Sequence, residues 1–248
     1  HQNGLMRAEL RAALKPVGDL ERLTNRILSG SATPRDLVTT RFILQDLPAI
    51  RALFSDLPEA LGAIIERIHP CTEELELLQN AISEDPPATL QNTGVIKPGF
   101  SGELDAVIEA SRHARDWIAN LEEVERKRTG IKSLKVGYNK VFGYYIEVTH
   151  SNTAGIPEEY IRKQTLVNAE RYITPEMKEY ESLVLNAEDR IHEIEQRIFR
   201  EVCAQIGKNS LNLLETSRKL AELDVLASLA EVAAVNGYTR PEVSSDTM

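Results

Sequence analysis

The chain has 248 residues, of which 42% are hydrophobic and 27% are charged, and its formal net charge is −9. This length suffices for one large domain or two modest ones, and no apolar run approaches the ~18 residues of a membrane-spanning helix. The acidic balance argues against a protein covered with nucleic-acid contacts, although it leaves room for a local basic patch.

The chain begins at His1 without an initiator methionine, and its first residues already resemble the middle of an amphipathic helix. We therefore expect a piece of a longer protein, without a secretory signal and located in the cytoplasm. Its two cysteines, Cys71 and Cys203, lie far apart and lack partners at metal-ligand spacing. This favours buried thiols in a reducing compartment over a disulfide.

Residues 5–82 are predicted to form a series of short helices. One begins at Asp19 and ends at Ser29-Gly30, where glycine favours a left-handed C-cap. The next begins at Thr33-Pro34, an N-cap residue followed by proline at the first helical position. These signals predict helix boundaries but do not determine how the helices pack.

Three further prolines, Pro48, Pro58 and Pro70, are each expected near the start or end of a helix. Residues 83–102 are rich in proline and glycine, which is typical of a connector. A short strand is predicted within this connector, at residues 94–96.

Two long helices are predicted at 103–128 and 174–207, the second beginning with the N-terminal signal Thr174-Pro175-Glu176. Apolar residues recur in both at intervals of three and four, as in a coiled-coil seam. The first seam is Leu104, Val107, Ser111, Ala114, Ile118, Leu121 and Val124, and the second is Met177, Tyr180, Val184, Ala187, Ile191, Ile194 and Ile198. The glutamates Glu188, Glu193 and Glu195 are expected on the solvated face. We expect the two helices to pair antiparallel, as a lever.

A final helix is predicted to return the chain to the first helical group, and it runs from Leu211 through Leu214, Leu220, Leu223, Leu226, Leu229 and Val232. The predicted fold class is therefore mainly α, with a discontinuous helical core and a long antiparallel coiled-coil lever that carries a small β-rich unit. The expected segments are 1–102 (core and connector), 103–128 (lever helix), 129–173 (β-rich unit), 174–207 (returning helix) and 208–248 (second part of the core).

Most of the chain's aromatic residues lie within or just after the β-rich unit, because six of the seven tyrosines and Phe142 fall between Tyr138 and Tyr180. Apolar residues alternate at period two over 134–138 and 144–148, as in half-buried strands joined by a turn of Asn and Gly. Residues 126–172 carry nine Lys or Arg against four Glu. A basic unit on an acidic chain indicates local contact with a polyanion.

Residues 164–168 are predicted to form an exposed strand or loop whose polar side chains suit phosphate oxygens, with Lys140, Lys163 and Arg171 supplying charge. Structural explanations compete with this hypothesis. The tyrosines fit the core of a small sheet, the lysines fit an ordinary solvated surface, and Arg171 fits an ion pair with Glu170 or Glu176.

Two segments of this unit, LKVGYNKVFGYYIEV and QTLVNAERYITPEMKEYE, closely resemble the clamp of the MutS family of DNA mismatch-recognition ATPases. GDLERLTNRILSGSATPRDL resembles the family's helical core, and LAELDVLASLAEVAAVNGYTRPEV resembles the stretch that leads into its ATPase domain. The resemblance covers nearly the whole chain. It implies a core, lever and clamp from a longer protein in which two subunits embrace a DNA duplex.

The resemblance places backbone contacts with duplex DNA, made without reading the sequence, in this unit. The candidate DNA-binding residues are Asn139, Lys140, Lys163, Gln164, Thr165, Leu166, Val167, Asn168 and Arg171. Many relatives have lysine at the position of Val167, so one phosphate contact is expected to be missing. The implied partners are the DNA backbone and a second MutS-like subunit, without a membrane, and a bacterial location would be the nucleoid.

No catalytic pattern accompanies these residues. The chain lacks the phosphate-binding loop G-x-x-x-x-G-K-[ST] and any Cys/His cluster with metal-site spacing. We therefore expect no enzymatic activity and no cofactor in this segment, with ATP and Mg²⁺ bound by the absent ATPase domain. Two alternatives stay open, a MutS homologue that acts on recombination junctions and a coiled-coil scaffold whose β-rich unit binds protein.

Overall fold

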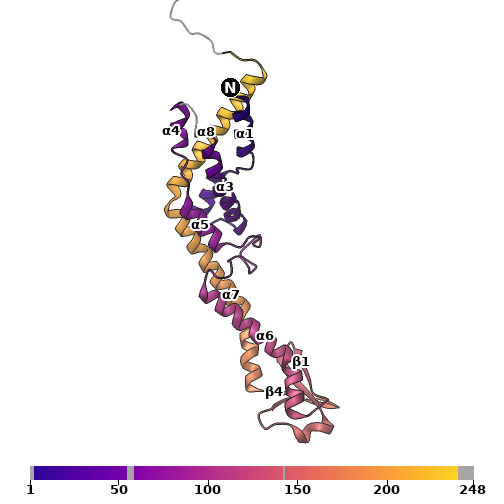
Figure 1. Cartoon of the computed structure of the whole chain (residues 1–248). Helices are drawn as coiled ribbons and strands as arrows, with labels where there is room; N and C mark the ends of the chain where they lie inside the picture. Colours follow the sequence, from indigo (N-terminus) through magenta and orange to yellow (C-terminus); the bar gives the residue numbers. More distant parts are fainter. Residues whose placement is uncertain (1–2, 55–58, 142, 240–248) are drawn as a thin grey trace, which may run out of the picture. The chain divides into compact units, whose positions relative to one another are not determined.

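The structure is a computed structural model that describes residues 3–54, 59–141 and 143–239 (Figure 1). The chain divides into two compact units. The first unit contains the residues up to Phe100 together with those from Gln196 onward, and the second contains Ser101–Glu195. The chain is mainly helical with one small antiparallel sheet, which confirms the predicted class at that level.

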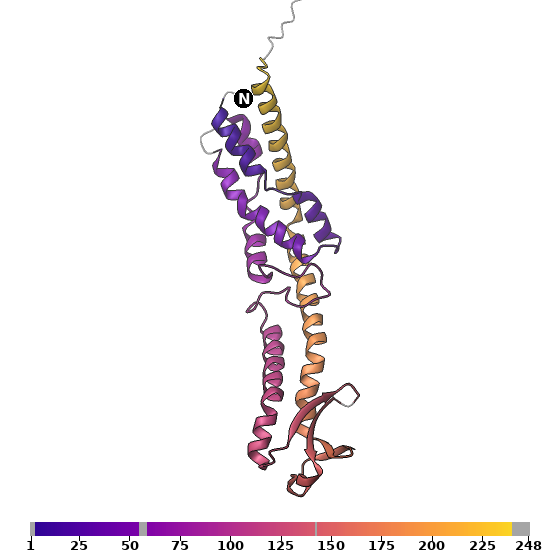
Figure 2. The same ribbon diagram turned by 90° about the vertical axis from the view of Figure 1, so that its right-hand side faces the viewer.

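The first unit is entirely helical in its named elements. It contains α1 (Gly4–Leu14), α2 (Leu20–Leu28), α3 (Pro34–Ala52), α4 (Glu59–Ile65), α5 (Thr72–Ala81), α8 (Ser210–Val235) and the last turns of α7 (Pro175–Lys208). Helix α8 packs against α1 and α2, while α3 packs against α5 (Figure 2). Segments from the two ends of the sequence therefore share one core.

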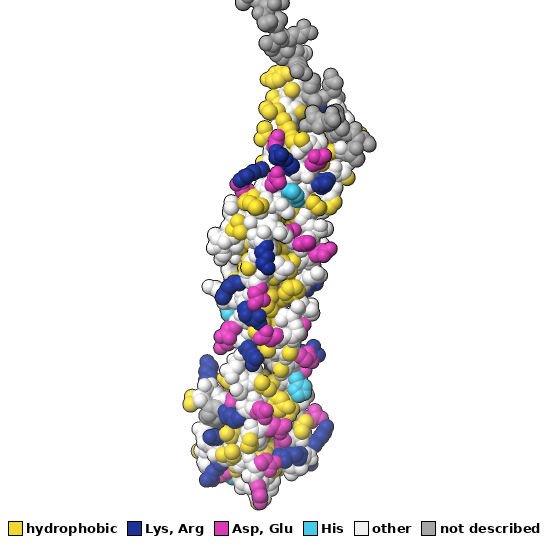
Figure 3. All heavy atoms as spheres, turned by 90° about the vertical axis from the view of Figure 1, so that its left-hand side faces the viewer, with side chains coloured by type: hydrophobic (Ala, Val, Ile, Leu, Met, Phe, Trp, Pro, Cys, Tyr) yellow, Lys and Arg dark blue, Asp and Glu magenta, His cyan; other side chains and the backbone are white. Residues whose placement is uncertain are grey.

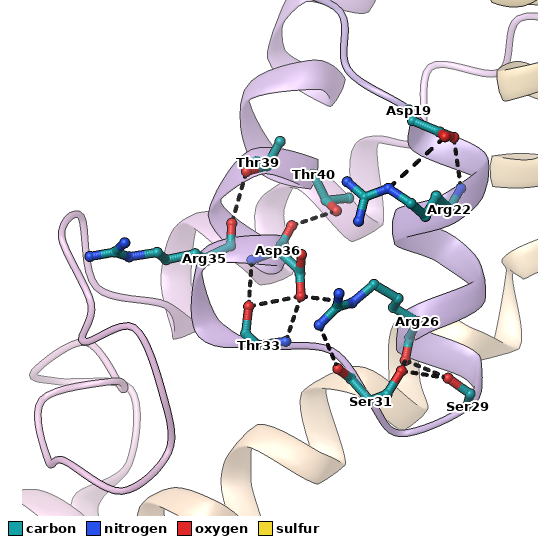
Figure 4. A network of polar contacts seen from close by, with 10 residues as sticks. All are labelled: Asp19, Arg22, Arg26, Ser29, Ser31, Thr33, Arg35, Asp36, Thr39 and Thr40. Carbon is teal, nitrogen blue, oxygen red and sulfur yellow. Dashed lines mark hydrogen bonds and ion pairs between the residues drawn. The ribbon is translucent and has the colours of Figure 1, made fainter.

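The predicted boundaries of α2 and α3 are confirmed by their caps (Figure 4). Asp19 caps α2, which ends before Gly30 with a φ of 70°. Thr33 and Asp36 form a reciprocal capping box at the start of α3, in which Asp36 Oδ2 accepts from the Thr33 N–H at 2.7 Å. Arg26 of α2 forms an ion pair with Asp36 at 3.1 Å, which joins the two helix ends.

The prediction for Pro48 is wrong, because this residue lies inside α3 rather than at a helix end. Its neighbours Leu44, Leu47 and Ile50 are fully buried. Proline removes one backbone hydrogen bond from a helix, but the burial of this apolar face keeps the helix continuous through the proline. Pro58 lies outside the described residues.

The connector contains an isolated bridge between Ile82 and Ile96, close to the strand predicted at residues 94–96. The Ser83 N–H donates to the Val95 carbonyl at 3.0 Å. Arg41 of α3 is buried and donates to the Ile82 carbonyl at 3.0 Å. The connector is therefore fastened to the helical core at one edge.

The predicted returning helix is present as α8, but its apolar residues do not all lie on the buried face. Leu220 and Leu223 are buried, whereas Leu211, Leu226, Leu229 and Val232 are exposed. The buried face instead comprises Leu213, Thr216, Ser217, Leu220, Leu223 and Ala227. Helix α8 carries apolar residues around its whole circumference, so their periodicity does not determine which face is buried.

The second unit contains α6 (Gly102–Thr129) and the first part of α7, which run antiparallel. Trp117 of α6 stacks on Tyr180 of α7 with ring centroids 4.2 Å apart, while Arg128 and Thr174 line one groove at the other end. The predicted start of α7 is confirmed, because Thr174 Oγ1 accepts from the Met177 N–H at 3.0 Å.

The predicted seams are partly wrong. Val124 is 54% exposed, and Glu125, at 8% exposure, occupies the buried position predicted for Val124. Glu125 is buried because it continues the alternation of three and four residues beyond Leu121. Glu195, predicted to be solvated, is buried at 3% exposure. A groove of about 300 Å³ lies between α6 and α7 beside Val107. The helices therefore pair without a uniformly tight seam.

The sheet of the second unit has four antiparallel strands in the order β1-β2-β4-β3. They are β1 (Lys135–Asn139), β2 (Gly143–Thr149), β3 (Ile161–Thr165) and β4 (Ala169–Ile173), and the 3₁₀ helix η1 (His150–Gly155) follows β2. The inner face packs against the two helices in one apolar cluster of Leu121, Ile131, Leu134, Ile146, Val148, Tyr160, Tyr172 and Met177. This cluster confirms the predicted period-two strands and the structural role of several tyrosines.

Candidate nucleic-acid interface

The outer face of the sheet carries a polar row that crosses all four strands. The strand register aligns Lys135 with Glu147, Glu147 with Arg171, and Arg171 with Gln164. Directly paired residues project from the same face of a sheet. Lysine, glutamate, arginine and glutamine therefore alternate across the solvent side, opposite the apolar cluster.

Arg171 is held firmly within this row. Its Nε donates to Glu147 Oε2 at 2.9 Å, and its Nη1 donates to Gln164 Oε1 at 3.0 Å. Its guanidinium lies 4.2 Å from the ring centroid of Tyr145, and that ring covers Gly137, where a Cβ would come within 2.7 Å of it. Hydrogen bonds and a cation–π contact together fix the side chain.

The predicted ion-pair partners of Arg171, Glu170 and Glu176, are wrong, because the partner is Glu147. Glu170 adjoins Arg171 on β4, and successive side chains of a strand point to opposite faces. Glu170 instead accepts from the Tyr172 hydroxyl and pairs with Arg162 at 3.5 Å. The Tyr172 hydrogen bond, followed by the charge of Arg162, lowers the pKa of Glu170.

Apart from Lys127, which pairs with Glu123 at 2.6 Å, the lysines of residues 126–172 differ from the arginines in their contacts. Each arginine forms an ion pair: Arg126 with Glu122, Arg128 with Glu125 and Glu159, Arg162 with Glu170, and Arg171 with Glu147. Four lysines are exposed and have no hydrogen-bonded or ion-paired partner among the described residues: Lys132, Lys135, Lys140 and Lys163. The uncompensated positive charge of the sheet is therefore carried by lysine.

Lys140 lies in the turn between β1 and β2. Asn139 Oδ1 accepts from the Val141 N–H at 2.8 Å, and Gly143 has a φ of 85°, which confirms the predicted Asn and Gly turn. Val141 at its tip is 91% exposed. The Asn139 amide oxygen is engaged within the turn, whereas the Lys140 ammonium extends into solvent.

The second predicted contact segment, residues 164–168, spans the end of β3 and the turn before β4. The Leu166 N–H donates to the Ala169 carbonyl at 2.8 Å, and the His150 N–H donates to the Asn168 carbonyl at 3.2 Å. Val167 at the tip is 92% exposed. Thr165 pairs with Glu170, and the side chains of Gln164, Thr165, Val167 and Asn168 are all exposed.

Lys163 lies at an irregularity of the edge strand β3, where the register shifts between Arg162 and Gln164. A bulge of this kind redirects a side chain and protects an edge strand against pairing with another chain. Its side chain is exposed, like those of every other β3 residue. The bulge therefore presents a lone ammonium group at the sheet edge.

The two predicted contact segments lie at opposite ends of the sheet. β2 begins at Gly143 beside the Lys140 turn, and its last residue, Thr149, pairs with Ala169, which follows the other turn. The length of β2, roughly 20 Å at ~3.4 Å per residue, separates them. The structure therefore does not bring Asn139 and Lys140 together with residues 164–168.

A buried acidic group fastens the sheet to α6. Glu125 Oε2 accepts from the Tyr160 hydroxyl at 2.6 Å and from Arg128 Nη2 at 2.7 Å. Burial, followed by the hydrogen bond to Glu125, raises the pKa of Tyr160. Glu122, one turn earlier, accepts from the Val136 N–H at 2.9 Å. Residue spacing along α6 already places Glu125 on the buried face, but its partners depend on the tertiary fold.

Sequence reasoning left Lys132 and Lys135 out of the candidate residues, although both carry uncompensated charge on the unit. The only sequence signal for them is the local excess of basic residues. On the face shown in Figure 3, basic and acidic side chains are interspersed and do not form one broad basic patch. On that face a polyanion would meet separate point charges.

The described residues contain no group of three or more His, Cys, Asp or Glu side chains that could hold a metal ion. Among the described helices, none is both long and apolar enough to cross a membrane. Cys71 and Cys203 are buried free thiols, as predicted, and burial raises the pKa of each to about 11.

Comparison with known proteins agrees with the resemblance. Residues 99–190 match the family model "MutS family domain IV". The chain is 48% identical over 243 residues to the DNA mismatch repair protein MutS of Acetivibrio thermocellus, covering 98% of this chain and 28% of that relative. It is 47% identical over 239 residues to MutS of Salinibacter ruber, covering 96% of the chain and 26% of the relative. The chain thus spans little more than a quarter of these relatives.

Proposed function

Because this chain belongs to the MutS family, we propose that it is the core, lever and clamp of a DNA mismatch-repair protein. In this proposal the sheet of the second unit is the clamp. It contacts the sugar-phosphate backbone of duplex DNA without reading the base sequence. The working compartment is the one that holds the DNA, which in a bacterium is the nucleoid.

The observation that carries this proposal is a set of exposed lysines that have no partner among the described residues, Lys132, Lys135, Lys140 and Lys163. An exposed ammonium group on a flexible stem suits a phosphate as a point charge and needs no defined base geometry. The arginines, whose planar guanidinium is suited to bidentate recognition of guanine, are already paired with carboxylates. This distribution favours positioning on DNA over sequence readout.

The antiparallel helices α6 and α7 suggest how the clamp is moved. We infer that they act as a coiled-coil lever between the clamp and an ATPase domain in the part of the relatives beyond this chain. ATP and Mg²⁺ would bind there, and this segment would not itself hydrolyse ATP. A second subunit of the same kind would close around the duplex. A role at recombination junctions and a protein-binding scaffold are the competing outcomes of the test below.

The test is the salt dependence of duplex binding by the Lys140→Ala, Lys163→Ala and double variants. Each lost phosphate contact should flatten the plot of log affinity against log salt by about 0.9. Affinity should fall by the same factor for perfectly paired and mismatched DNA, because phosphate contacts carry no sequence information. Fluorescence anisotropy across a salt series measures both quantities.

The matched control is Lys15→Ala, which removes an exposed lysine of the first unit and changes the net charge equally. It should leave the salt slope unchanged. An unchanged slope in the double variant would remove the sheet from the DNA interface and favour the scaffold. A clear preference for four-way junctions over duplexes would favour the recombination role.

A further inference from the structure

Glu181 of α7 is a buried carboxylate that lies against the start of β2, away from the polar row and from Glu125. It is 5% exposed. Its Oε1 accepts from the Tyr144 N–H at 2.8 Å, and Lys178, one turn earlier, donates to its Oε2. A buried carboxylate is costly unless it is paired and hydrogen-bonded, and both requirements are met here.

The contact with Tyr144 replaces a backbone hydrogen bond that β4 does not supply at this position. The pairing of β2 with β4 begins at Ile146, because β4 ends at Ile173 and the chain enters α7 at Pro175. The first residues of β2 therefore extend past the end of β4. The Glu181 carboxylate satisfies the Tyr144 N–H there, so α7 is joined directly to the beginning of β2.

Gly143, the residue before Tyr144, fits this contact closely. Its φ of 85° lies in the left-handed region that favours glycine, and a Cβ built on it would lie 1.6 Å from Glu181 Oε1. Gly143 pairs with Asn139 across the turn that contains Lys140. The carboxylate thus packs on the base of that turn.

We propose that Glu181 is a positioning residue that holds the β1–β2 turn so that Lys140 is presented to the DNA backbone. This inference rests on the proposed function. In it, Glu181 links the position of α7 to the contact that Lys140 makes with DNA. Lys163 lies at the far edge strand and is attached through β4, so its placement does not depend on Glu181. The two lysines therefore serve as test and control.

The effect of Glu181→Ala on DNA binding has an informative sign. Removing a carboxylate near DNA lowers electrostatic repulsion, so charge alone would strengthen binding. Release of the turn would weaken it. Glu179→Ala removes an equal charge from an exposed position two residues away on α7 and measures the electrostatic effect by itself.

The experiment is a pair of double-variant cycles on duplex binding by the whole 248-residue chain at fixed salt. Glu181→Ala should weaken binding relative to Glu179→Ala. In the Glu181→Ala/Lys140→Ala double variant, the fold loss of affinity should be at least about twofold smaller than the product of the two single losses. Both changes disrupt the same contact, that of Lys140 with DNA. Combined with Lys163→Ala, the effects should multiply.

Glu181→Gln keeps an acceptor for the Tyr144 N–H and should bind at least as well as Glu179→Ala, whereas equal losses in the Gln and Ala variants would contradict positioning by this hydrogen bond. Amide hydrogen exchange at Tyr144 should accelerate in Glu181→Ala alone. Multiplicative effects in the Lys140 cycle would overturn the inference. If Lys140→Ala and Lys163→Ala are both silent, the proposed function itself fails, which is a separate result.

Discussion

At the scale of single residues, the sheet separates its two kinds of basic side chain by their surroundings. Arg171 lies between Glu147 and Gln164 with Tyr145 beneath it, so two of its N–H donors and one face of its guanidinium are engaged. Lys140 and Lys163 occupy a turn and a bulge, and neither forms an ion pair among the described residues. The sequence shows three basic residues in one segment but does not distinguish their surroundings. The pairing of Arg171 depends on strand register, which the sequence alone does not determine.

The ion pair between α1 and α8 gives a prediction of acid sensitivity. Glu231 accepts from Arg7 at 2.6 Å and lies 3.2 Å from Arg11. The Arg7 hydrogen bond, followed by the charges of Arg11 and Arg7, lowers the pKa of Glu231 below its usual value of 4.5. A lowered pKa stabilises the folded state above 4.5, and this contribution is lost as pH falls through the folded-state pKa.

The Glu231→Gln variant should therefore be less stable than the wild type near neutral pH, and the difference should shrink as the pH falls through the folded-state pKa of Glu231. Urea unfolding followed by circular dichroism across this range measures the difference. Glu9→Gln, at an exposed position in the middle of α1, is the control and should track the wild type throughout. A constant gap between Glu231→Gln and the wild type at all pH values would refute the assigned titration.

At the scale of elements, α6 shows how far periodicity can predict burial. The alternation of three and four residues correctly predicts burial of Leu104, Ala114, Ile118 and Leu121. The same alternation continues to Glu125. Val124 is predicted instead only because its side chain is apolar. Glu125 is tolerated in this position because Tyr160 and Arg128 hydrogen-bond to it, and both partners are supplied by the tertiary fold.

This assignment predicts a contrast between neighbouring substitutions. Leu121→Ala should lower the stability of the second unit by about 2–5 kcal/mol, because Leu121 lies in the apolar cluster beneath the sheet. Val124→Ala should change it by less than about 0.5 kcal/mol, because that side chain is exposed. Fluorescence of Trp117, the chain's one tryptophan, follows unfolding of this unit. Equal losses in both variants would refute the assigned face.

At the scale of the whole molecule, the sequence predicts the mainly helical class, the two long helices and the small sheet between them. These predictions succeed because caps, periodic apolar residues and turn glycines act locally, as at Thr33, Gly143 and Thr174. The buried face of α8 and the separation of the two contact segments are not predictable in this way. They depend on which helices surround α8 and on the strand order of the sheet.

The central claim, that exposed lysines of the sheet contact the DNA backbone without reading its sequence, is tested most directly by a salt titration of wild-type binding. Perfectly paired and mismatched duplexes should bind equally. Binding should also be weak, because the chain carries a net charge of −9. The slope of log affinity against log salt should lie between about −1.8 and −3.6, because two to four lysine–phosphate contacts contribute ~0.9 each. A slope near zero, or a strong preference of this chain for the mismatched duplex, would contradict the account.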